Sequence, residues 1–245
     1  MICAKAALLF DNWDEALIWS CLQGYMGTMS ADDEHNPRSA VIDIGDFCFC
    51  AGTPDENLFC SITGSKLLVP KDGAWGSAIE HFFGKRAKKT LRYATKKEPA
   101  VFCKNKLISY VAALDACYDL TLFNRETFEA ALRERWSADL CSQFRDYADY
   151  QSRAIGVAVL HQGNLVAGAS PYAIYRNGIE IEIDTHPEYR CQGLATVCGA
   201  KLILDCLSRN IYPSWDAHDL RSVHLAEKLG YHLSHPYITY EIEPE

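Results

Sequence analysis

The sequence lacks several features that would place it in a class at once. No two cysteines have the C-x-x-C spacing typical of a zinc site, and no uninterrupted apolar run approaches the roughly 20 residues that span a bilayer. The N-terminal stretch has neither the length nor the cleavage pattern of a signal peptide. An odd number of cysteines, eleven, favours reduced thiols. We therefore expect a cytoplasmic protein that is not inserted in a membrane and has no metal site.

Positive charge is also scarce. The formal net charge of −8 argues against nucleic acid as a partner. The exception is the segment KRAKKTLRYATKK, residues 85–97, which we call the basic segment. A run of this kind on a helix is usually a solvated face, and a binding site for an anion or a partner is the alternative.

The chain of 245 residues is long enough for two domains, although no repeat or low-complexity linker divides it. We expect a mixed α/β domain over residues 1–117 and a second domain over 118–245. In the first, the patterns predict helices over 13–26 and 77–94 and a strand region over 40–52.

The second half has a clearer order of elements. A strand at 118–123 precedes helices over 125–136 and 138–153, and three strands follow at 155–161, 165–175 and 179–185. Asn177-Gly178 is a hairpin signal between the last two. A helix over 195–210, a strand over 211–217, a helix over 220–230 and a closing strand over 238–243 complete the order. Antiparallel pairing is expected first, with a parallel crossover at the helix after residue 195.

The loop between strand and helix reads RCQGLA, residues 190–195. A helix N-terminus offers unpaired N–H groups and a positive dipole, a glycine permits close approach, and an arginine adds charge. The motif therefore suits a phosphate. An ordinary strand-to-helix turn explains it almost equally well.

At these residues the chain resembles the GNAT superfamily of acyl-CoA-dependent N-acyltransferases, whose signature is Q/R-x-x-G-x-G/A. Arg190, Gly193 and Ala195 match it, and the resemblance covers residues 118–245. It implies an α/β fold with a mainly antiparallel central sheet flanked by helices, acetyl-CoA as co-substrate, and a small-molecule amine as acceptor. More narrowly, the chain resembles the two-part acetyltransferases of the zwittermicin-resistance type. The first domain is then a candidate degenerate GNAT-like half, and a homodimer is compatible with the resemblance.

The resemblance also implies positions for the cofactor. The strand end would pair with the pantetheine arm, the loop would hold the pyrophosphate, and the next helix would begin near the cofactor. In that order the residues are Ile183, Asp184 and Thr185; Arg190, Cys191, Gln192, Gly193, Leu194, Ala195 and Thr196; and Asp219 and Ser222. Asp219 replaces the usual asparagine, and Ala226 replaces the tyrosine that acts as general acid in many members. Tyr231, Tyr237 or Tyr240 could substitute, or no acid is needed, because a thiol of pKa about 8 to 9 leaves as thiolate.

Three carboxylates alternate along the strand before the loop. Glu180, Glu182 and Asp184 share one face by the two-residue period of a strand. That face is either solvated or lines a cleft. In a cleft the carboxylates could hold an ammonium group and accept its proton.

We therefore expect Glu182 as general base, with Glu180 as second choice. Asp184, Trp215 and Asp216 are expected to contact the acceptor, although Trp215 is equally suited to the core. The alternative function is a non-catalytic acyl-CoA-binding or regulatory module, which the replacements at Asp219 and Ala226 would favour.

Overall fold

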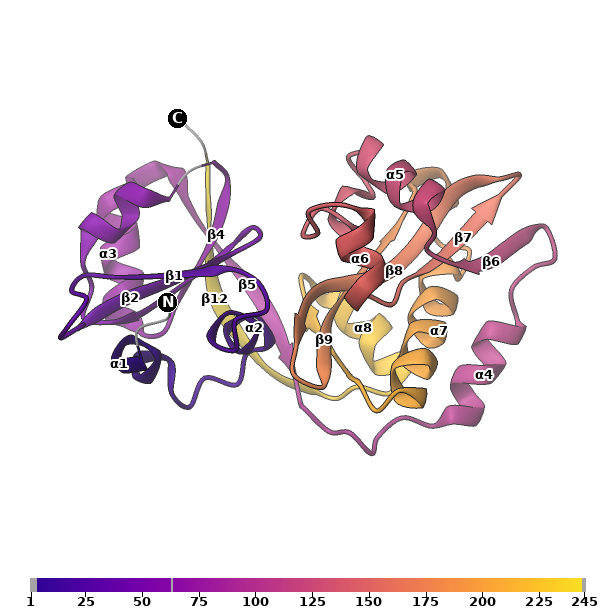
Figure 1. Cartoon of the computed structure of the whole chain (residues 1–245), viewed down its shortest axis with the longest axis horizontal. Coiled ribbons are helices and arrows are strands. Elements are labelled where there is room, and N and C mark those ends of the chain that lie inside the picture. The colour runs from indigo at the N-terminus through magenta and orange to yellow at the C-terminus, as the bar shows by residue number, and fades with distance from the viewer. Residues whose placement is uncertain (1–3, 63, 244–245) are drawn as a thin grey trace. The chain divides into compact units, whose positions relative to one another are not determined.

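The structure is a computed structural model that describes residues 4–62 and 64–243, and it divides into two compact units (Figure 1). One comprises residues 1–92 together with 236–245, and the other comprises residues 93–235. The expected boundary at residue 117 differs from this division. In addition, strand β12 (Leu233–Ile242) returns the end of the chain to the first unit, where it pairs with β4 (Lys66–Pro70).

The first unit is built on a mixed sheet. Strands β1 (Thr28–Ala31), β2 (Ser39–Ile44) and β3 (Phe47–Gly52) form an antiparallel meander, β3 pairs in parallel with β4, and β12 lies between β4 and β5 (Ala87–Thr95). Its helices are α1 (Ala4–Ala7), α2 (Ala16–Leu22) and α3 (Gly73–Phe83). Trp75, Leu68 and Tyr240 bring α3, β4 and β12 into one apolar core.

The prediction of an α-helix through residue 94 was wrong beyond Phe83, because the basic segment begins in a 3-10 turn that ends at Arg86 and continues as strand β5. Helix α3 ends at Gly84, whose φ of 54° is costly for other residues, and the chain then enters β5. Lys88 pairs with Glu243 and Lys89 with Glu80, while the Arg92 guanidinium lies 4.9 Å from the ring centre of Phe47. These three cations thus lie along β5, where Lys88 and Lys89 are exposed and Arg92 is half-buried.

The second unit contains a five-stranded sheet in the order β10-β9-β8-β7-β6. The strands are β6 (Tyr118–Leu122), β7 (Val157–His161), β8 (Asn164–Tyr175), β9 (Gly178–Thr185) and β10 (Tyr212–Ser214). Pairing is antiparallel except between β9 and β10, which are parallel across helix α7 (Leu194–Ser208). The expected fold class, a mainly antiparallel central sheet flanked by helices, is therefore confirmed.

The remaining helices of this unit are α4 (Lys104–Ala112), α5 (Arg125–Arg133), α6 (Tyr147–Arg153) and α8 (Leu220–Leu229). Helix α4 was not predicted. The helix predicted over 138–153 is instead a 3-10 turn, η4 (Ala138–Leu140), followed by α6, because the Asp146 side chain accepts the Asp149 N–H and begins a new helix there. None of the described helices has the length and apolar character needed to span a bilayer.

Strands β9 and β10 pair only along the first half of β9. Their register pairs Tyr212 with Gly178 and Ser214 with Glu180, and it ends there. The chain then passes Trp215 into a separate short strand, β11 (Asp216–Ala217), which pairs with the end of β5. The single strand predicted over 211–217 is thus two strands, and the second half of β9 has no β10 neighbour.

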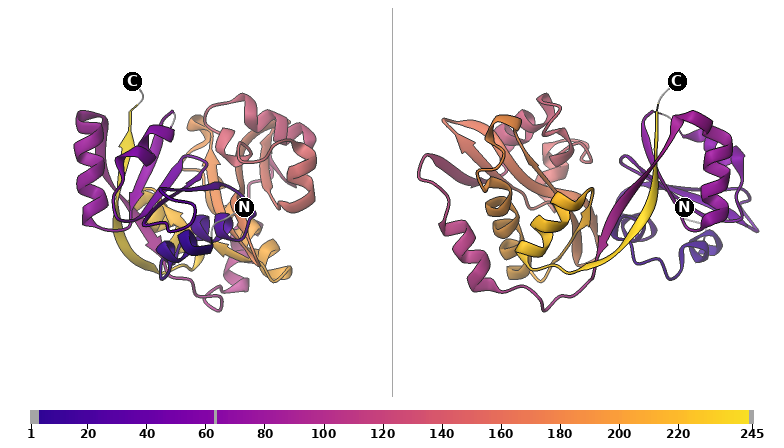
Figure 2. Two further views of the ribbon diagram at one scale, coloured as in Figure 1. Left: turned by 60° about the vertical axis from the view of Figure 1, so that its left-hand side comes forward. Right: turned by 180° about the vertical axis from the view of Figure 1, so that it is seen from behind.

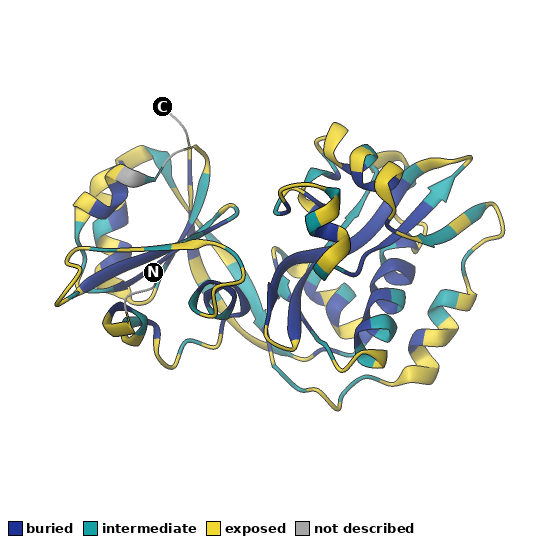
Figure 3. Ribbon diagram, in the orientation of Figure 1, coloured by how far each residue is buried: buried dark blue, intermediate teal, exposed yellow. Residues whose placement is uncertain are grey.

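The two faces of β9 meet different elements (Figures 1 and 2). A Cβ on Gly199 of α7 would lie 3.0 Å from Cδ1 of Ile183, so the odd-numbered residues face α7. Gly168 is the cross-strand partner of Asp184, and a Cβ there would lie 2.9 Å from Leu140 of η4. The face with the three carboxylates is therefore the face that η4 covers. Figure 3 shows β8 largely buried, while β9 is buried in its first half and intermediate in its second half.

Candidate active site

The loop before α7 adopts a backbone that few sequences allow. Cys191 and Gly193 both have left-handed conformations, with φ of 61° and 83°. A Cβ on Gly193 would meet no atom within 4 Å, so glycine is required by conformation and not by crowding. The open space at Gly193 also means that a ligand can approach its backbone.

Helix α7 begins without a side-chain cap among the described residues. The helices α3, α5, α6 and α8 each begin at a side chain that accepts a backbone N–H, supplied by Asp72, Asn124, Asp146 and Asp219. The first N–H groups of α7 therefore keep their hydrogen-bonding capacity for an external acceptor, at the positive end of a 15-residue helix. This geometry fits a phosphate group.

Aromatic side chains hold the loop in place. Tyr118 on β6 donates its hydroxyl hydrogen to Oε1 of Gln192 at 2.5 Å, and Nδ1 of His161 on β7 lies 2.9 Å from the Tyr189 hydroxyl. The Arg190 Nε donates to the carbonyl oxygen of Thr185 at 3.3 Å. The sequence analysis missed Tyr118 and His161, because they come from distant segments that only the sheet brings beside the loop.

The three carboxylates of β9 differ in burial. Glu180 is 4% exposed and lies opposite Ser214, at the last paired position between β9 and β10. Burial raises the pKa of Tyr175, and the charge of nearby Glu180 raises it further. Glu182 and Asp184 are half-buried and continue along the part of β9 that β10 does not cover.

The titration of Asp184 is altered by its surroundings. Burial, followed by the charge of Asp139 on η4, raises its pKa from 3.8 to about 6, while Arg190 acts in the opposite direction. Next to it along β9, Glu182 lies opposite Ser170, whose Oγ is 2.9 Å from the buried hydroxyl of Tyr150. The half-buried carboxylates of β9 thus lie beside a pair of buried hydroxyls, and carboxylates suit binding and deprotonation of an amine.

The residues predicted at the start of α8 already have internal partners. Asp219 accepts the backbone N–H of Ser222 at 2.9 Å and is bound by Arg221. Ser222 Oγ accepts the indole N–H of Trp215 at 3.1 Å, and Trp215 is 4% exposed. Trp215 and Ser222 therefore hold α8 against the short strands, and Asp216, half-buried, pairs through its backbone with Ala94.

The structure also shows where Ala226 lies, and where the three tyrosines lie that could act as general acid in its place. Ala226 is fully buried on α8. Tyr231 is buried and donates its hydroxyl hydrogen to the carbonyl oxygen of Pro213 at 2.7 Å. Tyr240 lies in the first unit, where it donates to Glu80. Tyr237 belongs to the same unit.

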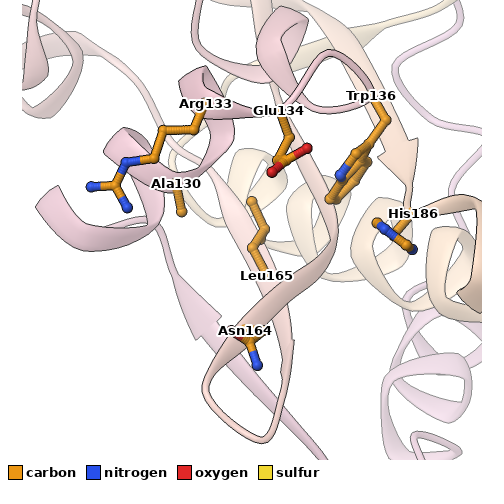
Figure 4. A pocket seen from close by; sticks show the side chains of 7 residues that line it. All are labelled: Ala130, Arg133, Glu134, Trp136, Asn164, Leu165 and His186. Carbon is orange, nitrogen blue, oxygen red and sulfur yellow. The ribbon is translucent and has the colours of Figure 1, made fainter.

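A pocket of about 290 Å³ opens near the end of β9 (Figure 4). The Trp136 and His186 rings meet edge to face there, with centroids 5.4 Å apart, and Glu134 points toward the same space. The lining residues are Ala130, Arg133, Glu134, Trp136, Asn164, Leu165 and His186. None of the residues predicted from the sequence lines it.

The fold and the loop define the class of the protein, and comparison with known proteins agrees. The family model "GNAT acetyltransferase" matches residues 7–240, so the chain belongs to the GNAT acetyltransferase family. It is therefore an acyltransferase, and the match extends well beyond the 118–245 segment in which the sequence resemblance was seen.

Two relatives are similar along most of their length. A GCN5-related N-acetyltransferase-like protein from Streptococcus suis 89/1591 is 43% identical, with a TM-score of 0.93 over 97% of this chain and 96% of that chain. The "Uncharacterized N-acetyltransferase YdfB" of Bacillus subtilis (strain 168) is 25% identical, covering 94% of this chain and 91% of its own. A GCN5-related N-acetyltransferase from Kribbella flavida, 16% identical with a TM-score of 0.57 over 98% and 96% of the two chains, shares the fold.

Proposed function

We propose that this protein is an acetyl-CoA-dependent N-acetyltransferase whose acceptor is a primary amine on a small cationic molecule. The observation that carries the proposal is the uncapped start of α7 beside a strand whose second half, which β10 does not cover, bears Glu182 and Asp184. One feature suits the phosphates of the donor, and the other suits an amine.

On the donor side, the residues of the chain fit a CoA pyrophosphate. The N–H groups that follow Gly193 would donate hydrogen bonds to the phosphate oxygens, and Arg190 would contribute charge. The bound acetyl-CoA would supply an activated thioester. The backbone of Ile183 to Thr185 would pair with the pantetheine arm as an added strand would, and the absence of a β10 neighbour along this part of β9 supports that role.

On the acceptor side, an alkyl ammonium with a pKa near 10 must lose a proton before its nitrogen can attack a carbonyl carbon. Glu182 would accept that proton, directly or through a water molecule, while Asp184 and Glu180 stabilise the cation before the transfer. The new C–N bond then forms as the C–S bond breaks and the thiolate leaves. No cysteine of the chain is needed as a nucleophile.

The narrower assignment, to the two-part zwittermicin-resistance type, remains part of this proposal. The division into two compact units supports it, since a two-part enzyme requires a second folded unit. The first unit would then contribute to the acceptor side or to an interface between copies of the chain.

A thiol-release assay with acetyl-CoA and a panel of amines tests the proposal. Arg190→Ala should raise the KM for acetyl-CoA, corresponding to about 1.5 to 3 kcal/mol of lost binding. Arg209→Ala is the matched control, because Arg209 is exposed at the opposite end of the same helix. Equal KM values in all three proteins would contradict the donor assignment.

The same assay tests the base. Glu182→Gln keeps the shape of the side chain but cannot accept a proton, so kcat should fall by roughly 10²- to 10⁴-fold while the KM for acetyl-CoA changes little. An unchanged kcat would remove Glu182 from the mechanism. Calorimetric binding of acetyl-CoA without transfer to any amine would instead favour a non-catalytic module.

A further inference from the structure

Two lysine ammonium groups flank one tyrosine beside the first turn of α7. Nζ of Lys228 on α8 lies 5.3 Å from the ring centre of Tyr110 on α4, and Nζ of Lys106 lies 5.8 Å from it. Lys228 also donates to Oγ1 of Thr196 at 3.3 Å, and the Tyr110 hydroxyl donates to the Lys228 carbonyl oxygen at 3.3 Å. We call Lys106, Tyr110, Thr196 and Lys228 the Tyr110 cluster.

The cations of the Tyr110 cluster are not neutralised by the protein. Within residues 4–62 and 64–243, neither Lys106 nor Lys228 forms an ion pair with a carboxylate, although the chain carries a net charge of −8. Most other lysines with a described polar contact reach a carboxylate, as Lys66, Lys88, Lys89 and Lys201 do.

The placement of Lys106 is also unfavourable for its own helix. It lies in the first turn of α4 together with Lys104, and the α4 N-terminus has no side-chain cap among the described residues. Cations at a helix N-terminus oppose the helix dipole. A dianionic group bound here would reverse that unfavourable interaction.

We propose that the Tyr110 cluster binds the 3′-phosphate on the adenosine of CoA, the group that distinguishes CoA from 3′-dephospho-CoA. The inference rests on the proposed function, in which the pyrophosphate lies at the start of α7. Thr196, which Lys228 contacts, is three residues after Gly193 and so lies within one turn of that site.

The chemistry of the two groups matches. A phosphate monoester carries a charge of about −1.5 to −2 near neutral pH, which two ammonium groups balance. The adenosine follows directly after the pyrophosphate in the donor, so its phosphate must lie within a few ångströms of the first turn of α7. The Tyr110 ring contacts both ammonium groups, one from its own helix and one from α8.

Titration calorimetry with CoA and with 3′-dephospho-CoA tests the proposal without requiring turnover. The wild-type protein should bind CoA roughly tenfold more tightly than 3′-dephospho-CoA. Lys228→Gln should weaken CoA binding about 3- to 10-fold and change 3′-dephospho-CoA binding by less than about twofold. Lys106→Gln should act in the same direction.

Lys89→Gln is the matched control. Lys89 also lies over a tyrosine ring, 5.5 Å from the centre of Tyr240, but it belongs to the first unit and pairs with Glu80. The Lys89→Gln substitution removes the same charge from the chain. The ratio of the affinities for CoA and 3′-dephospho-CoA should therefore not change. Retained binding of 3′-dephospho-CoA shows that each variant is folded.

The outcomes separate this inference from the proposed function. If the wild-type protein binds CoA and 3′-dephospho-CoA equally well, the Tyr110 cluster has no such role although the donor assignment stands. A parallel loss of both ligands in Lys228→Gln also overturns the inference. If neither ligand binds the wild-type protein, the proposed donor itself is wrong, and the inference falls with it.

Discussion

The chemical properties of individual carboxylates in this protein depend on how deeply each one is buried. Glu180, Glu182 and Asp184 are equivalent in the sequence pattern, since all three alternate along one strand. In the structure Glu180 is buried at the point where β10 leaves β9, while the other two lie half-buried along the uncovered part. The same residue type therefore meets two environments within one strand.

Asp184 gives a pH-dependent prediction. Burial and Asp139 raise its pKa from 3.8 to about 6, so the ionised carboxylate destabilises the fold. Below pH 4 the group is protonated in both states, between about 4 and 6 only the unfolded chain ionises, and stability therefore falls as pH rises through this window. Asp184→Asn should remove this fall and gain on the order of 1 to 3 kcal/mol at pH 7.

Thermal unfolding of wild type and Asp184→Asn from pH 4 to pH 7 measures the effect. The difference in Tm should open as pH rises. Asp119→Asn is the control, because Asp119 is exposed on β6 of the same sheet. A difference that is constant across the range would mean that Asp184 is not the group responsible.

At the scale of the element, the way each helix begins differs. Some helices are capped by a side chain of the protein, and others leave their first N–H groups available to a ligand. Five described helices begin at a carboxylate or amide cap, whereas α7 begins at Gly193 and α4 at Cys103, neither of which supplies one. The uncapped start of α7 lies at the proposed pyrophosphate position, and Lys106 of the Tyr110 cluster lies in the first turn of α4. A missing cap costs a helix little when an anion takes the place of the side chain.

The cap of α8 gives a prediction of the opposite kind. A hydrogen bond from the Ser222 backbone, aided by Arg221, lowers the pKa of Asp219, so its stabilising effect is present at neutral pH and is lost as pH falls through that lowered value. Asp219→Ala should lower stability by about 0.5 to 2 kcal/mol. Asp219→Asn keeps a capping oxygen and should lose much less.

Urea unfolding at pH 7 compares the two variants, and calorimetry with CoA shows whether Asp219 also contacts the donor. If Asp219 is only a structural cap, Asp219→Ala should have reduced stability but an unchanged affinity for CoA. That affinity is measured at a urea concentration at which both variants are folded. Affinity that falls in both variants without a loss of stability would restore the contact implied by the family resemblance.

For the whole molecule, the dominant feature is that the first unit needs both ends of the chain. Strand β12 lies between β4 and β5, and its residues Thr239, Tyr240 and Ile242 are buried in that unit. The first 92 residues alone therefore lack an interior strand of their own sheet. A sheet opened at an interior position loses its core contacts and exposes two unpaired edges.

Ending the chain after His235 should consequently unfold the first unit while the second persists. Limited proteolysis should digest residues 1–92 and spare a fragment near 93–235, and circular dichroism should show loss of strand signal. A chain that ends after Glu243 keeps all of β12 and is the control. Equal protease resistance of the two shortened chains would show that β12 is dispensable.

Local sequence determined much of the second unit. The Asn177-Gly178 turn, the apolar and charged alternation of β9, and the Arg190 to Ala195 motif each specify their structure over a few neighbouring residues. Periodicity and turn chemistry are short-range properties, so the order of strands and the strand-loop-helix conformation around Gly193 could be predicted. The same rules failed at the basic segment, where the apolar residues fit a helix but Gly84 ends it and sheet pairing decides the rest.

Only the tertiary structure determined which distant segments of the chain lie next to each other. Nothing near Tyr118 in the sequence points to Gln192, nothing near Tyr110 points to Lys228, and nothing in the last ten residues indicates that they complete the first unit. The sequence by itself determined the family, the elements and the loop, because these depend on local pattern. Contacts between distant segments, which only the folded chain brings together, decide three further features. These are the burial of each carboxylate, the point at which β10 stops pairing with β9, and the unpaired cations near α7.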